Sequence, residues 1–275
     1  MALPQADRFD PALTKRVLSG VVLVAIALGD LWLGGWLFAG LVILAVALMA
    51  DEWAKLAVGL TGWPQQWVRV SAILFPVLAI IEVMQGRPDL GLMVLAGGVV
   101  IASGAAALAG RGVEAAAAGV VYLGLPAVAL IWLRNEPGGS TLTVLWLLLV
   151  VWTTDIGAYF VGRTIGGPKL APSISPGKTW AGLVGGMTLA ALVGAVVSHL
   201  GGGVPWLGFV AGAVLAVIAQ IGDLYESHLK RRAGTKDSGI LIPGHGGVLD
   251  RLDGLLFAAP AYAFLLYAAG PRLLP

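Results

Sequence analysis

The sequence has no cysteine, few charged residues and no hydrophilic block long enough to fold as a separate soluble domain. Without cysteine, the chain can form neither disulfide bonds nor thiolate metal sites. Only 12% of its 275 residues are charged and the formal net charge is +2, so the bases are too few and too scattered for a nucleic-acid-binding surface. The chain therefore belongs neither to the disulfide-stabilised proteins nor to the nucleic-acid-binding proteins.

What the chain has in abundance is apolar sequence. Hydrophobic residues make up 58% of it, against about 45–50% in soluble domains. A helix needs about 20 apolar residues to cross a membrane. The run 17–50 is long enough for two such helices, separated near Gly34-Gly35. Further runs lie at 67–84, 90–109, 113–133, 141–161, 179–199, 204–222 and 254–270. The sequence therefore predicts an all-α polytopic membrane protein with about nine transmembrane helices.

The charges between these runs predict an orientation. Lys15-Arg16 and the following apolar residues resemble a signal peptide, but Asp7, Asp10 and the return of apolar sequence at Leu31 predict an uncleaved first span. With nine spans, the bases opposite the N-terminus are only Arg87, Arg134 and Arg272. The positive-inside rule then places the N-terminus in the cytoplasm. We expect a single integral membrane domain over 1–275, with N-terminal spans in 1–140 and the catalytic spans and loops in 141–270.

The segment 227–253 carries an unusual density of charge for this chain. If the preceding apolar run continues as a helix, Asp223, Glu226, Ser227 and Lys230 share one face, and Asp250 and Asp253 share a face of the next helix. The residues between these helices include a glycine-rich run suited to bringing backbone N–H groups near an anion. Carboxylate pairs, bases and a glycine loop can together hold a divalent metal and a polyphosphate. The charged residues of the segment are Lys230, Arg231, Arg232, Lys236, Asp237, Asp250, Arg251 and Asp253, and Asp223 and Glu226 lie just before it.

An alternative interpretation of this segment is a loop whose bases only obey the positive-inside rule. That interpretation does not explain the acids beside the spans, because carboxylates near hydrocarbon cost free energy. Asp155, within or at the end of another predicted span, is ambiguous in the same way and could be a structural partner of a nearby base. The polar loop after it contains hydroxyls and lysines suited to phosphate oxygens: Lys169, Ser173, Ser175, Lys178 and Thr179.

Gly177-Lys178-Thr179 ends like a Walker A loop. That motif is excluded because Pro172 stands where its first glycine should be, and no parallel strand is expected before it. Gly182, Gly185 and Gly186 follow in a predicted span, where small residues let helices approach closely.

The charged segment resembles the signature of the phosphatidate cytidylyltransferases (CDP-diacylglycerol synthases). The match has no gap and includes Ser227, Leu229, Lys230, Arg231, Lys236, Asp237, Gly239, Ile242, Pro243, His245, Gly246, Gly247, Val248, Asp250, Arg251, Leu252 and Asp253. A second stretch of the same family is similar to 155–182, except that Gly177 replaces a usual lysine and Ala181 a usual glutamate. The resemblance covers roughly 140–270, and the first five spans match only in hydropathy.

The resemblance implies transfer of CMP from CTP to phosphatidic acid in the bilayer, giving CDP-diacylglycerol and pyrophosphate. Because the attacking lipid phosphate is already anionic, the reaction needs a metal and positive side chains rather than a strong base. Mg²⁺ is therefore expected, with the number of cations left open. The implied metal ligands are Asp223 and Asp250, with Glu226 and Asp253 as further ligands or supporting groups.

The other implied roles follow the two matched stretches. Catalytic residues besides Asp223, Asp250 and Asp253 are Lys230, Arg231, Lys236 and His245, the last to orient a phosphate or a carboxylate. Substrate-binding residues are Asp155, Lys169, Ser173, Ser175, Lys178, Thr179, Ser227, Asp237, Gly246, Gly247 and Arg251.

Two other classes of function fit part of the pattern. A transporter also carries intramembrane carboxylates, but transporters often show internal repeats and none is found in this sequence. A CTP-dependent lipid or polyprenol kinase is the nearer alternative, because its needs for nucleotide and metal overlap. We expect an enzyme of the bacterial inner (plasma) membrane with a cytoplasmic active site, no nucleic-acid partner, and a homodimer left open.

Overall fold

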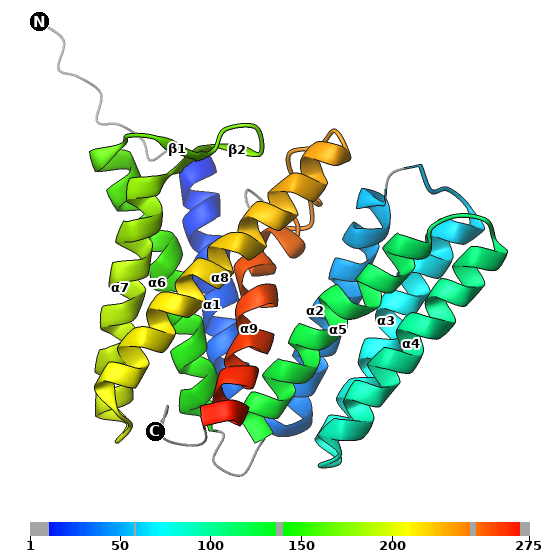
Figure 1. Cartoon of the computed structure of the whole chain (residues 1–275), viewed down its shortest axis with the longest axis horizontal. Helices are drawn as coiled ribbons and strands as arrows, with labels where there is room; N and C mark the ends of the chain where they lie inside the picture. Colours follow the sequence, from blue (N-terminus) through cyan, green and yellow to red (C-terminus); the bar gives the residue numbers. More distant parts are fainter. Residues whose placement is uncertain (1–10, 58, 136–139, 243–245, 270–275) are drawn as a thin grey trace, which may run out of the picture.

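The computed structural model describes residues 11–57, 59–135, 140–242 and 246–269 (Figure 1). Within these ranges the chain forms nine helices and one two-stranded hairpin. The helices are α1 (Pro11–Leu33), α2 (Gly35–Leu56), α3 (Trp63–Met84), α4 (Pro88–Leu108), α5 (Val113–Asn135), α6 (Thr141–Ile165), α7 (Trp180–Leu200), α8 (Pro205–Arg232) and α9 (Leu249–Ala269). The strands are β1 (Lys169–Ala171) and β2 (Ser175–Thr179).

Seven helices, α2 to α8, are long and apolar enough to cross a membrane. The chain is therefore an all-α polytopic membrane protein apart from its short hairpin. The predicted run 17–50 overlaps α1 and α2, and each of the other seven runs overlaps one helix. The part of α1 whose side chains the structure describes, Gly20–Leu33, is apolar and shorter than a span. Helix α9 begins with Asp250, Arg251 and Asp253, which lower the hydropathy of its first turns.

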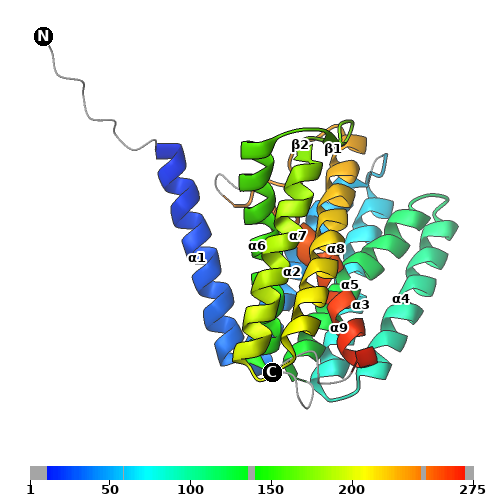
Figure 2. The same cartoon turned by 60° about the vertical axis from the view of Figure 1, so that its left-hand side comes forward.

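The helices form two groups that α9 connects. Helices α6, α7 and α8 pack together on one side and α2 to α5 on the other, while α9 contacts both α8 and α5 (Figure 1). Helix α1 leans away from the other helices and contacts α2 and α6 (Figure 2). Residues of α9 are thus placed where both groups can reach them.

Small residues let α6 and α7 approach closely, as the sequence predicted. A Cβ atom added at Gly182 would lie 2.8 Å from the carbonyl oxygen of Ala158, and one added at Gly186 would lie 2.6 Å from that of Thr154. Real side chains do not occupy such distances. The glycines therefore serve helix packing, which is the main source of association between helices in lipid.

Between α6 and α7, where we expected a polar, turn-rich loop, the structure contains an antiparallel hairpin. Strand β1 pairs with β2 across a turn at Pro172–Ile174, and Thr179 then begins α7 by accepting a hydrogen bond from Gly182 N at 3.0 Å. Arg231 Nε of α8 donates to the carbonyl oxygen of Ile174 at 3.3 Å. The hairpin and the end of α8 therefore lie side by side at one end of the molecule (Figure 1).

Candidate active site

Helix α8 continues ten residues beyond the predicted apolar run and ends at Arg232. Basic residues in its last turn interact favourably with the negative end of the helix dipole. On this extension Ser227 Oγ donates to Asp223 Oδ1 at 3.3 Å, and Lys230 Nζ lies 2.5 Å from Glu226 Oε2. Both contacts join residues four apart, so the predicted common face of Asp223, Glu226, Ser227 and Lys230 is confirmed.

Lys230 joins α8 to α9. Its Nζ atom contacts Glu226 at 2.5 Å and Asp250 Oδ1 at 2.6 Å. Glu226 is fully buried, and the side chains of Lys230 and Asp250 are 11% and 4% exposed. A buried ammonium between two carboxylates offsets part of the cost of removing them from water. Lys230 therefore neutralises protein carboxylates in this structure.

The other oxygen of Asp250 orders the loop that precedes α9. Oδ2 accepts hydrogen bonds from Ser238 N at 2.9 Å, Ser238 Oγ at 3.0 Å and Gly247 N at 2.8 Å. Gly246 has a φ of 81°, and a Cβ atom there would lie 2.5 Å from Asp250 Oδ2. Only glycine fits such a position. The Gly247 N–H group, which we expected to bind substrate, is thus already used by Asp250.

Glu52 of α2 belongs to the same network and was missed in the sequence. Its side chain accepts hydrogen bonds from Ser238 Oγ at 2.9 Å, Val248 N at 2.9 Å and Leu249 N at 2.8 Å. The signal in the sequence is an acid at the end of a long apolar run, where burial is costly. That signal does not identify the partners, which are 186 to 197 residues away along the chain.

A second set of charges lies nearer the surface. Asp223 Oδ2 forms an ion pair with Lys178 of the hairpin. Helices α8 and α9 touch beside it, because a Cβ atom at Gly222 would lie 2.5 Å from the carbonyl oxygen of Asp253. Asp155 of α6 and Asp253 of α9 lie within electrostatic range of Asp223 and of Lys178. We call Asp155, Asp223 and Asp253 the acidic cluster.

The remaining predicted residues differ in their exposure. Thr179 is buried and its hydroxyl caps α7, while Ser227 is buried and Ser175 is half-buried. His245 lies outside the described residues, as do Pro243 and Gly244. The exposed residues are Lys169, Ser173, Arg231, Lys236, Asp237 and Arg251.

Three of the four residues predicted as metal ligands contact one of two lysines, and the fourth, Asp253, contacts neither. Glu226 and Asp250 contact Lys230, whereas Asp223 contacts Lys178 and Asp253 accepts from Gly254 N at 2.8 Å. In the described ranges no three His, Asp or Glu side chains form a ready-made metal site. Carboxylate oxygens nevertheless suit Mg²⁺, which proteins usually bind through one or two carboxylates together with substrate phosphates. The acidic cluster fits such a shared site.

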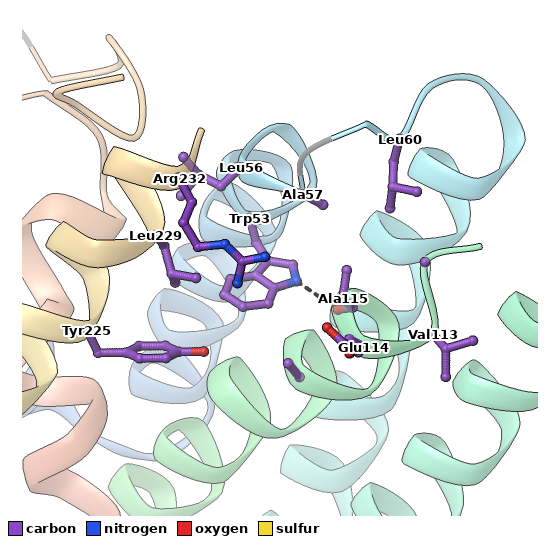
Figure 3. A pocket seen from close by; sticks show the side chains of 12 residues that line it. Trp53, Leu56, Ala57, Leu60, Val113, Glu114, Ala115, Tyr225, Leu229 and Arg232 are labelled. Atoms are coloured by element: carbon purple, nitrogen blue, oxygen red, sulfur yellow. Dashed lines mark hydrogen bonds between the residues drawn. The ribbon is translucent and has the colours of Figure 1, made fainter. Parts of the chain in front are cut away.

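A separate pocket of about 390 Å³ lies between the ends of α2, α5 and α8. Tyr225 and Arg232 point towards it from α8 and Glu114 lies on α5, while Trp53 Nε1 donates to the carbonyl oxygen of Ala115 at 2.9 Å (Figure 3). Its walls are otherwise apolar, and its lining includes none of the residues predicted for the site.

Comparisons with known proteins identify the family to which the chain belongs. The sequence model of the cytidylyltransferase family matches residues 14–269. The phosphatidate cytidylyltransferase of Brucella suis is 41% identical over 274 residues, which cover 94% of this chain and 93% of the relative. That of Pseudomonas aeruginosa is 37% identical over 273 residues, covering 94% of this chain and 98% of the relative. The match therefore also covers the first five predicted spans, which lie outside the two motifs and had resembled the family only in hydropathy. The chain belongs to the cytidylyltransferase family.

Proposed function

We propose that this protein transfers CMP from CTP to phosphatidic acid, forming CDP-diacylglycerol and pyrophosphate. The observation that carries the proposal is the ion pair between Lys178 and Asp223. It joins the stretch 155–182 to α8 four residues before Ser227, where the second stretch that resembles the family begins. The relatives named phosphatidate cytidylyltransferase support the same reaction.

The reaction needs charge neutralisation more than proton transfer. A lipid phosphate oxygen forms a new bond to the α-phosphorus of CTP, and the bond from that phosphorus to the β-phosphate oxygen breaks with its electron pair leaving on pyrophosphate. Both reactants are anions, so their repulsion dominates the barrier. Exposed bases of the hairpin, of the end of α8, of the segment that leads into α9 and of the first turn of α9 can bind the phosphates. They are Lys169, Arg231, Lys236 and Arg251.

Mg²⁺ is the cofactor that we propose for this site. Asp223 and Asp253 would hold it together with the CTP phosphates, and Asp155 would add negative charge beside them. The ion would neutralise charge that develops on the phosphates. Asp250 would take part directly only by exchanging its contact with Lys230, because its other oxygen already accepts hydrogen bonds from Ser238 N and Gly247 N and shares the Ser238 hydroxyl with Glu52.

We propose that the chain crosses a bacterial inner membrane nine times and that its N-terminus lies in the cytoplasm. The uneven distribution of bases supports this orientation. The hairpin and the α8–α9 loop then face the cytoplasm, where CTP is dissolved. Phosphatidic acid stays in the bilayer because each exposed methylene costs about 0.8 kcal/mol. The two substrates would therefore meet at headgroup depth. A homodimer stays a prediction.

The decisive test separates transfer of a nucleotide from transfer of a phosphate. Purified protein with CTP, phosphatidic acid and Mg²⁺ should release pyrophosphate and CDP-lipid in equal amounts, and a chelator should stop the reaction until Mg²⁺ is restored. Release of CDP with phosphorylated polyprenol or lipid alcohol would instead identify a CTP-dependent kinase. If neither product forms with either lipid, the enzymatic proposal is contradicted.

A further inference from the structure

Glu52 is the most strongly held acidic side chain that the reaction does not use directly. It lies in α2, is 4% exposed, and accepts three hydrogen bonds from the loop before α9 and from the start of that helix. We propose that Glu52 is a positioning residue, which orients the start of α9 and the carboxylate of Asp250 for catalysis. This inference rests on the proposed function.

The N–H groups at the start of α9 show how the orientation is set. Gly247 N donates to Asp250, and the next two, Val248 N and Leu249 N, donate to Glu52. A carboxylate at a helix N-terminus is stabilised by these N–H groups and by the helix dipole. Asp253 follows Asp250 by three residues on the same helix. A rotation of the first turn would therefore displace both aspartates.

Ser238 extends this control to the side chain of Asp250. Its hydroxyl lies 2.9 Å from Glu52 Oε2 and 3.0 Å from Asp250 Oδ2. A serine hydroxyl has one hydrogen to donate, so the two carboxylates compete for it. The position of one carboxylate therefore depends on that of the other.

Two glycines leave space for Glu52 and for little else. A Cβ atom at Gly239 would lie 2.7 Å from Glu52 Oε1, and one at Gly247 would lie 2.5 Å from both carboxylate oxygens. Among the described residues, no Lys or Arg nitrogen lies within ion-pair distance of Glu52. The charge of Glu52 is balanced by the Ser238 hydroxyl and by the N–H groups at the start of α9. This arrangement is expected of a side chain that holds the helix in place.

Glu52→Gln tests the proposal with little change in size. Either orientation of the new amide places its NH₂ group against a backbone N–H of Val248 or Leu249, so the start of α9 must shift. Because small displacements of catalytic groups are costly, kcat should fall on the order of 10²-fold. The KM values for CTP and phosphatidic acid should stay within about three-fold of those of the unmodified protein, because the substitution does not alter how the substrates bind before the reaction.

Asp51→Asn is the matched control. Asp51 precedes Glu52 in α2, loses the same charge, and pairs only with Lys55 and Arg69 at the surface among the described residues. Its kcat should equal that of the unmodified protein. A Glu52→Gln protein with the kcat of the control, or with an unchanged kcat and a raised KM, would overturn the positioning role.

Ser238→Ala provides a second test that keeps Glu52 bonded to α9. It should also lower kcat, and the double variant should lose less than the product of the two single effects, because both changes break one network. If Glu52→Gln does not accumulate as folded protein, Ser238→Ala decides by the same criteria of kcat and KM. The proposed function fails separately if the unmodified protein and Asp51→Asn both form no CDP-lipid.

Discussion

Lys230 illustrates how a residue in a family motif can serve the protein itself. Its ammonium group is held between Glu226 and Asp250 inside the protein. Removing one partner from a buried charge network costs about 3–5 kcal/mol. We therefore predict that Lys230→Met lowers the thermal unfolding temperature in detergent markedly, because two buried carboxylates are left side by side.

The matched change is Lys236→Met in the same motif. Lys236 is exposed and has no ion pair among the described residues, so its unfolding temperature should stay close to that of the unmodified protein, while its KM for the phosphate-bearing substrates rises. Equal unfolding temperatures for the two variants would show that Lys230 does not stabilise the fold.

A substitution at Asp253 should have the opposite effect to Lys230→Met, because it should change activity and leave stability unchanged. The Asp253 carboxylate contacts no other side chain by hydrogen bond or ion pair in the described ranges, and accepts only from Gly254 N. Asp253→Asn should therefore leave the unfolding temperature unchanged and reduce kcat by about 10²-fold, with a higher Mg²⁺ concentration needed for half-maximal rate. Asp89→Asn, in the first turn of α4, is the control. An unchanged rate for Asp253→Asn at all Mg²⁺ concentrations would exclude it as a ligand.

At the scale of elements, the close contact of α6 and α7 positions the hairpin that carries Lys178. Gly186→Ala would force a methyl group against the carbonyl oxygen of Thr154. Overpacking of this kind costs about 1–3 kcal/mol, so we predict a lower unfolding temperature together with reduced turnover. Both effects share one cause, the separation of the two helices.

Gly97→Ala in α4 is the corresponding control for helix propensity. Nothing lies within 4 Å of a Cβ atom added at Gly97, and alanine favours a helix over glycine. Its unfolding temperature should be equal to or higher than that of the unmodified protein. A decrease as large as that of Gly186→Ala would mean that packing between α6 and α7 is not the cause.

For the whole molecule, the cysteine-free sequence allows a direct test of orientation. Thr235 is exposed in the loop after α8. A Thr235→Cys variant should react with a membrane-impermeant thiol reagent only after the cells are opened, because the proposed topology places this loop in the cytoplasm. Labelling of intact cells from outside would place the candidate active site on the other side of the membrane.

Several features follow from the sequence alone because they depend on local properties. Hydropathy sums over about 20 neighbouring residues, so it predicted the membrane class and the approximate position of each helix. Helical periodicity placed Asp223, Glu226, Ser227 and Lys230 on one face. The spacing of the charged motif indicated the family, which the comparisons confirmed.

Only the tertiary structure determined which charges meet. It assigned Lys230 to Glu226 and Asp250, placed Lys178 of the hairpin on Asp223, and brought Glu52 to the start of α9. These contacts depend on how the helices pack, and in lipid that packing is directed by small residues that occur throughout this chain. A glycine allows close approach without specifying the partner, so the meeting of residues 52 and 249 is a property of the assembled helices.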